Sequence, residues 1–227
     1  MASQLIGTQL GTWNFNFKIC CHSVQKALHP IGTQLETLNL KLETLLSMRI
    51  LKENTIGLVV DIQERLVPVM EENEQFIGNC IKLIQGLQIL DIQFIVTQQY
   101  TKGLGDTIAE IQSVINDFHY IEKKDFSCFG EPEVAEKLAL SGAKNVIICG
   151  IESHVCVLQT AIDLKEVGYV PIVVMDCVSS RSFDNMDLAS ERFRYEGIMM
   201  TSLESVLFEL TRSASAIEFK EISKLVK

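Results

Sequence analysis

The most reactive side chains of this sequence lie in one short stretch, CGIESHVCVLQTAIDL, which covers residues 149–164. Cys149 falls inside the apolar run NVIICG, so we expect its thiol to be buried, protonated and inert. Cys156 falls where the apolar spacing becomes helical, which predicts a position in the first turn of a helix. There, backbone N–H groups and the helix dipole favour a thiolate, and the same N–H groups can hold an oxyanion. The stretch therefore predicts a reactive cysteine at position 156.

His154 is the nearest candidate for a base, but its spacing from Cys156 argues against that role. In a strand-to-helix turn, side chains two positions apart do not face each other, and a base has to come within about 3 Å of the thiol. We therefore expect His154 at the rim of a pocket or on the surface. We expect no catalytic metal, because the histidines form no ligand pair at a useful spacing and no Cys/His spacing suits zinc.

Alternating apolar and amphipathic segments predict the sheet that positions these side chains. Short runs rich in Val and Ile are typical of parallel strands that are buried on both faces. We predict strands at 56–61, 93–98, 119–123, 145–150, 170–176 and 197–202. We predict helices at 72–90, 106–116, 131–141, 155–167 and 184–196. This alternation predicts an α/β fold with a doubly wound, six-stranded and mostly parallel sheet, flanked by helices in three αβα layers with a Rossmann-like strand order.

Ligands bind such sheets at the carboxyl ends of the strands, so the residues at those ends are of most interest. The first predicted strand ends in Asp61, the third in Lys123 and Lys124, and the fourth leads to Cys156. Each residue alone has an ordinary structural explanation, as a turn former, a solvated lysine or a buried cysteine. Together they predict a site that combines a carboxylate, an ammonium group and a thiol.

Composition limits the partners and the compartment. The chain has 20 basic and 29 acidic residues, a net charge of −9, and no Lys/Arg cluster, so nucleic acid and anionic membrane surfaces are poor partners. No apolar run is long enough to span a bilayer, and no secretory signal is evident at the N-terminus. Seven cysteines without zinc-binding spacing favour free thiols and a cytoplasmic location. Residues 1–35 lack Asp and Glu, as transit peptides do, so organelle import is the alternative, although they also lack Arg.

The composition changes near Met48. This change predicts an N-terminal extension over residues 1–47, partly helical or poorly ordered, and one main domain over 48–227. Within the extension, leucines recur at spacings of three and four residues at Leu35, Leu38, Leu42 and Leu45. This pattern predicts one apolar stripe on a helix. The stripe packs on its own domain, belongs to a poorly ordered extension, or contacts another subunit.

Several motifs in order give the chain a family resemblance. VVDIQERL, IEKKDFSCFG, CGIESHVCVLQTAIDL and VVMDCVSSRS resemble the successive signatures of the isochorismatase-like cysteine hydrolases. TQQYTKGLGDT and FKEISKLVK are similar to the isochorismatase domain-containing branch of that family. The resemblance covers about residues 48–227 and implies a catalytic triad of Asp61, Lys123 and Cys156. The family pattern of Lys, two variable residues and Phe-Ser selects Lys123 in preference to Lys124.

The resemblance also implies how the site is completed. A cis peptide bond between Ile151 and Glu152 would turn the Glu152 N–H toward the Cys156 N–H and form an oxyanion hole. Residues that flank the same rim are candidates for the substrate pocket, although each has an equally good explanation as packing: Gln63, Gln99, Tyr100 and Phe126. The segment TQQYTKGLG lacks the histidines of the nicotinamidase branch, so we expect neither a metal nor nicotinamide as the substrate.

The implied function is a cysteine-dependent hydrolase that acts on a small amide or related C–N bond through a thioester, without a cofactor. Members of the family commonly form dimers or larger assemblies, so a homo-oligomer is expected. The alternative is a non-catalytic or redox-sensing oligomeric scaffold that retains the triad. A dinucleotide-dependent oxidoreductase is disfavoured, because VVDIQERL offers no glycine for a pyrophosphate. Arg181 in SSRS is either a binding group for an anionic substrate or part of an ordinary serine-rich turn.

Overall fold

A parallel sheet organises the computed structural model, which describes residues 49–227. Its six strands are β1 (Thr55–Val60), β2 (Phe94–Gln99), β3 (Ile121–Lys123), β4 (Asn145–Ile151), β5 (Val170–Ser179) and β6 (Met199–Thr201). The strand order is β3-β2-β1-β4-β5-β6, and every neighbouring pair is parallel. The predicted fold class is therefore confirmed. The extension predicted for residues 1–47, with its leucine stripe, lies outside the described residues.

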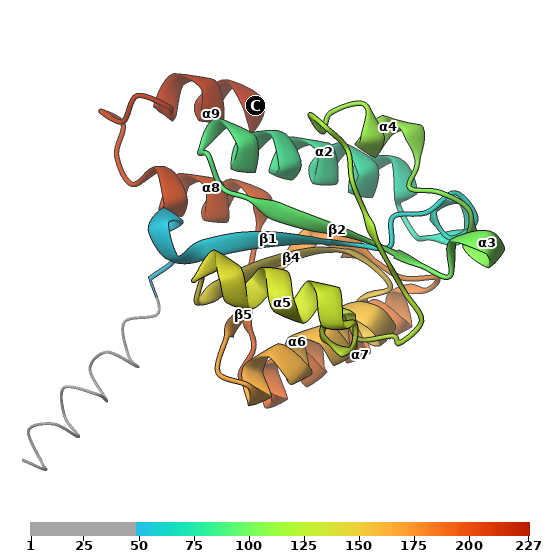
Figure 1. Cartoon of the computed structure of the whole chain (residues 1–227). Helices are drawn as coiled ribbons and strands as arrows, with labels where there is room; N and C mark the ends of the chain where they lie inside the picture. The colour runs from blue at the N-terminus through green and yellow to red at the C-terminus, as the bar shows by residue number, and fades with distance from the viewer. Residues whose placement is uncertain (1–48) are drawn as a thin grey trace, which may run out of the picture. The chain divides into compact units, whose positions relative to one another are not determined.

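Helices cover both faces of this sheet. They are α2 (Asn73–Ile89), α3 (Thr101–Leu104), α4 (Ala109–Gln112), α5 (Pro132–Ser141), α6 (Leu158–Glu166), α7 (Phe183–Tyr195), α8 (Leu203–Thr211) and α9 (Phe219–Leu225). In Figure 1, α2, α8 and α9 lie on one side of the strands, and α5, α6 and α7 lie on the other. The buried side chains form one core under each layer of helices, so both faces of the sheet are apolar.

Two helix predictions differ from the structure, and some of its helices were not predicted at all. The helix predicted for 106–116 contains only the short α4, because the chain before it is held extended: Thr107 bridges Gln63, and the Ile108 N–H donates to the Ile62 carbonyl at 3.0 Å. The helix predicted for 155–167 starts as a turn of π-helix over Ser153–Val157, and α6 follows it. The sequence patterns did not predict α8 and α9. The signal for α8 was Ser202, which caps the helix by accepting a hydrogen bond from the Ser205 N–H.

Register places the ends of four strands side by side. Val60 of β1 pairs with Thr97 of β2 and with Gly150 of β4, and Gln99 of β2 pairs with Lys123 of β3. Because parallel strands share one direction, the residues that follow these pairs meet at the same edge of the sheet. That edge is the carboxyl edge, where the sequence predicted the chemistry.

Candidate active site

Asp61 and Lys123 meet at the carboxyl edge although one strand separates them. Asp61 follows β1 directly and has a positive φ of 50°, and Lys123 is the last residue of β3. Lys123 Nζ lies 2.6 Å from Asp61 Oδ2, and both side chains are wholly buried. From β2, between them, Thr97 Oγ1 donates to Asp61 Oδ1 at 2.8 Å. The structure therefore brings together the carboxylate and the ammonium group that the sequence predicted to share one rim.

The ammonium group of Lys123 has further acceptors. Gln99 Oε1 lies at 2.7 Å, the Phe126 carbonyl at 3.1 Å and the Asp125 carbonyl at 3.2 Å. Lys124 is exposed, so the structure places Lys123, and not its neighbour, beside Asp61. The three N–H groups of the Lys123 ammonium donate to these three neutral oxygens. The contact of Lys123 Nζ with Asp61 Oδ2 is therefore an ion pair without the geometry of a hydrogen bond.

Cys156 reaches the site on the turn that follows β4. Gly150 has φ 122°, and a Cβ there would lie 2.0 Å from the Val60 carbonyl oxygen, so only glycine fits where β4 passes β1. The Ile151–Glu152 peptide bond is cis, as the resemblance implied. Cys156 then lies in the π-helical turn Ser153–Val157, one turn earlier than the start of α6. Cys156 therefore lies in the first helical turn after β4, as predicted, and that turn is a π-helix.

The thiol of Cys156 is only 7% exposed, and this burial governs its ionisation. Burial, followed by the negative charge of Asp61, raises the pKa of Cys156 to about 12, although the Lys123 charge opposes the rise. The expectation of a resting thiolate, which considered only the helix dipole and free N–H groups, is not supported, because desolvation outweighs both effects. The thiol needs a proton acceptor before it can attack.

Asp61 is the acceptor that the geometry offers. Burial raises the pKa of its carboxyl above the ordinary value, while the charge of Lys123 and the hydrogen bond from Thr97 lower it. For Lys123, burial lowers the pKa, but the negative charge of Asp61, joined at high pH by those of the ionised Cys128 and Cys156 thiols, outweighs burial, and the pKa is raised. Lys123 is therefore an ammonium ion, and Asp61 is a carboxylate with an increased affinity for protons.

His154 and Arg181 are directed at other partners. His154 Nδ1 lies 3.0 Å from Ser180 Oγ, as expected for a residue outside the triad. Arg181 Nε donates to Glu152 Oε2 at 2.9 Å, and the arginine side chain is 60% exposed. Both contacts connect the turn before Cys156 to the end of β5.

The four pocket candidates divide into two pairs. Gln63 is wholly buried and hydrogen-bonded to the backbone of Gln99, and Gln99 contacts Lys123. Tyr100 and Phe126 are 49% and 54% exposed, so their rings are open to an incoming molecule. The buried Gln63 and the partly buried Gln99 support the site, and the two aromatic residues lie at its surface.

Thr97, Ser127 and Cys128 are residues of this site that the sequence patterns missed. Thr97 orients Asp61, and Cys128 Sγ lies 3.6 Å from Thr97 Oγ1. Ser127 Oγ and Asp61 Oδ2 are buried side-chain atoms without a hydrogen-bond partner among residues 49–227. Ser127 Oγ is therefore a place where a substrate or water can bind, whereas Asp61 Oδ2 is already paired with the charge of Lys123. The Phe-Ser of KKDFS was the available signal for Ser127.

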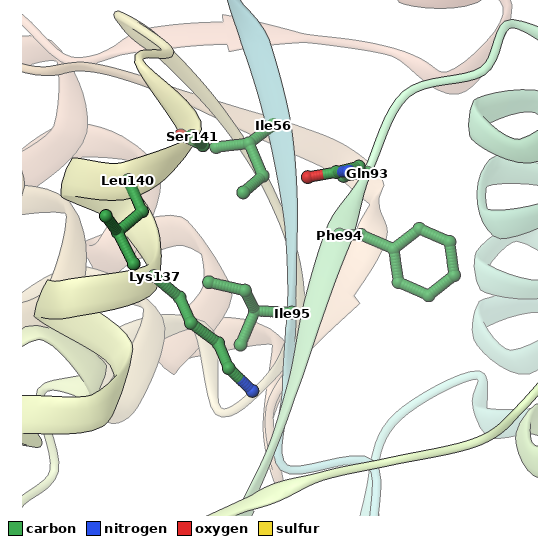
Figure 2. Close-up of a pocket in the computed structure, with 7 residues that line it drawn as sticks. All are labelled: Ile56, Gln93, Phe94, Ile95, Lys137, Leu140 and Ser141. Atoms are coloured by element: carbon green, nitrogen blue, oxygen red, sulfur yellow. The ribbon is translucent and has the colours of Figure 1, made fainter.

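A cleft of about 460 Å³ lies in another part of the domain, and Figure 2 shows the residues that line it. It is lined by residues near the amino ends of β1 and β2 and by residues of α5: Ile56, Gln93, Phe94, Ile95, Lys137, Leu140 and Ser141. None of the candidate catalytic residues lines it. Within residues 49–227 there is no group of three or more His, Cys, Asp or Glu that could hold a metal, and no helix long and apolar enough to cross a membrane.

Known proteins resemble this chain in sequence over most of the described residues. A model of the isochorismatase domain matches residues 55–205. The secreted isochorismatase effector Isc1 of Phytophthora sojae (strain P6497) is 37% identical over 184 residues, which are 79% of this chain and 87% of that protein. Isochorismatase domain-containing protein 2 of Danio rerio is 35% identical over 178 residues, covering 78% of this chain and 89% of the relative.

Solved structures agree with these sequence matches. The MAR1 ribonuclease from Caenorhabditis elegans has a TM-score of 0.74 at 35% identity, covering 78% of this chain and 92% of that one. The YcaC gene product from Escherichia coli, described as an octameric hydrolase of unknown specificity, has a TM-score of 0.74 at 22% identity, covering 78% and 90%. The second likeness concerns the fold alone.

Proposed function

This chain belongs to the isochorismatase family of hydrolases, and from that premise we propose that it is a cysteine-dependent hydrolase of a small amide or related C–N compound. The buried pair of Asp61 and Lys123 beneath the Cys156 turn carries the proposal. Burying two charges costs on the order of several kcal/mol for each ion, so a buried ion pair is seldom kept for stability. Perturbed carboxyl and thiol groups in one site are instead typical of catalysis.

The first half of the reaction forms a thioester. Asp61 accepts the thiol proton, and Cys156 Sγ forms a bond to the substrate carbonyl carbon. The negative charge that develops on the carbonyl oxygen is held by the N–H groups of Glu152 and Cys156. The C–N bond then breaks, and Asp61 returns the proton to the departing amine.

The second half of the reaction restores the enzyme. Asp61 accepts a proton from water, and the hydroxide forms a bond to the thioester carbon. The C–S bond breaks, the acid is released, and the Cys156 sulfur regains a proton. Throughout, the charge of Lys123 offsets the negative charge that moves between the carboxylate, the sulfur and the oxyanion.

A panel of small amides, carbamoyl compounds and ureides tests this proposal. We expect release of ammonia or amine, and an acyl group on Cys156 after acid quenching, detected by peptide mass spectrometry. Cys156→Ala removes both, with a loss of rate on the order of 10⁴ or more. Cys149→Ala is the matched control, because Cys149 is a buried cysteine that lies in β4 and not at the site. Full turnover by Cys156→Ala contradicts the proposal.

The resemblance to a protein described as a ribonuclease makes RNA a second substrate to test. The net charge of −9 argues against it, since RNA binding depends on neutralising phosphates with Lys and Arg. An RNA oligonucleotide therefore belongs in the panel. RNA cleavage that is lost in Cys156→Ala but without any acyl-enzyme would replace the amide by a phosphodiester.

We propose that the protein acts as a homo-oligomer in a reducing compartment such as the cytoplasm. The E. coli neighbour described as octameric supports assembly, and the five free cysteines among residues 49–227 support a reducing environment. The relative described as secreted is the counterexample for location. Light scattering of the purified protein and fractionation of cells test the two statements separately.

A further inference from the structure

Gln99 contacts Lys123 directly, and the proposed mechanism does not use it. It is the last residue of β2 and pairs in register with Lys123, so the two side chains project on the same side of the sheet. Gln99 Oε1 accepts from Lys123 Nζ at 2.7 Å, and Gln99 Nε2 donates to the Lys124 carbonyl at 2.6 Å. The second bond sets the direction of the amide, because a flipped amide would point N–H groups at the ammonium and at no acceptor.

Gln63 in turn holds Gln99. Gln63 Oε1 accepts from the Gln99 N–H at 2.7 Å, and Gln63 Nε2 donates to the carbonyls of Gln99 at 3.1 Å and Gly105 at 2.7 Å. Gln63 is wholly buried, and both hydrogens of its amide are engaged. Gln63, Gln99 and Lys123 thus form a hydrogen-bonded chain across the ends of β1, β2 and β3.

The chemical type of Gln99 matters as much as its place. A neutral amide oxygen stabilises the ammonium group without adding negative charge, so the charge of Lys123 stays opposed to the acidic groups around it. These groups are Asp61, Cys128 and Cys156. A carboxylate at position 99 would add a fourth acidic group and compete for the same charge.

We propose that Gln99, fixed by Gln63, is a positioning residue that directs Lys123 Nζ toward Asp61 and Cys156 and thereby sets the reactivity of the thiol. This rests on the proposed function only in taking Cys156 as the reacting group. The sequence alone left Gln63 and Gln99 open between the substrate pocket and packing, and gave neither of them this role.

The pH dependence of Cys156 alkylation tests the inference without a substrate. Full-length protein is treated with iodoacetamide over a range of alkaline and neutral pH, and labelling of the Cys156 peptide is followed by mass spectrometry. We expect Gln99→Glu to shift the alkylation profile upward and to slow labelling about tenfold at a fixed pH below the midpoint. Gln99→Met removes the acceptor without adding charge, so we expect a smaller shift in the same direction.

Gln98→Met is the matched control. Gln98 is a buried glutamine in the same strand, and it bonds Thr107 and Thr101 on the side away from Lys123. We expect its alkylation profile to match that of the unchanged protein, whereas a general loosening of β2 would shift all three variants. Thermal unfolding shows which variants fold. If only one of the two Gln99 variants folds, its alkylation profile is compared with that of Gln98→Met.

Profiles of the Gln99 variants that coincide with that of the unchanged protein overturn the inference, as does an equal shift in Gln98→Met. The result is separable from the proposed function. Shifted profiles in a protein that forms no acyl-enzyme with any amide would leave Gln99 as a positioning residue and remove the amidase. An acyl-enzyme together with unshifted profiles of the Gln99 variants would support the amidase and remove Gln99 as a positioning residue.

Discussion

Lys123 Nζ lies 2.6 Å from Asp61 Oδ2 in a place that water does not reach, and 62 positions separate the two residues in the sequence. Thr97 holds the other oxygen of the carboxylate. The pair is thus held from β2 as well as from its own two strands, and each charge depends on the other for its ionised state. The predictions below follow from this dependence.

Replacing the lysine isolates the contribution of the pair to stability. Lys123→Met leaves Asp61 buried without a counter-charge, so we expect a loss of about 3 to 5 kcal/mol at neutral pH. Without Lys123 the folded-state pKa of Asp61 rises further, so the loss grows as the pH rises above the unfolded value. Urea unfolding at mildly acidic and at alkaline pH measures this trend. Lys124→Met, at the exposed neighbour, is expected to change stability by less than about 0.5 kcal/mol, and an equal loss for both variants contradicts the prediction.

Removing the carboxylate is expected to separate thiol reactivity from catalysis. The Asp61 charge is one cause of the raised pKa of Cys156, so Asp61→Asn lowers that pKa and increases the thiolate fraction. We therefore expect faster alkylation of Cys156, while hydrolysis falls by about 10²- to 10⁴-fold because the base is absent. Parallel assays of alkylation and turnover measure both effects. Slower alkylation of Asp61→Asn would contradict this prediction, because it would show that Asp61 increases the thiolate fraction of Cys156.

The raised pKa of Cys156 also predicts a signature in alkaline stability. The thiol ionises near 9 in the unfolded chain but at about 12 in the folded protein. In that window the folded state binds more protons, so its stability falls as the pH rises, by about 1.4 kcal/mol per pH unit. We expect Cys156→Ala to reduce the slope of unfolding free energy against pH by that amount. Val157→Ala, in the same buried turn, should lower stability without changing the slope.

Arg181 is expected to affect the reaction more than the fold. Its pair with Glu152 is largely exposed on the arginine side, so Arg181→Gln should cost less than about 1 kcal/mol. Because Glu152 supplies one of the two proposed oxyanion donors, we expect a lower kcat with a smaller change in KM. Arg192→Gln breaks a comparable surface pair with Glu196 and serves as the control. Equal kinetic effects of the two variants would remove Arg181 from the site.

Much of the fold was predictable because its signals are local. The strands are continuous apolar runs, and their alternation with helices indicates a doubly wound parallel sheet. The short α4 was not predictable, because contacts of Thr107 and Ile108 with the distant residues Gln63 and Ile62 hold that chain extended. Helical periodicity says nothing about such tethers.

By itself the sequence determined the six-stranded parallel sheet, the family, and the choice of Lys123, Asp61 and Cys156 as residues of one edge. Residue type and spacing carry that information, because strand ends in a parallel sheet meet regardless of their separation along the chain. Only the tertiary structure decided that the Cys156 thiol is protonated, and that Gln63 and Gln99 support Lys123 from inside the fold. Desolvation and hydrogen-bond partners depend on everything packed around a group, and residues from four strands and their loops pack around this one.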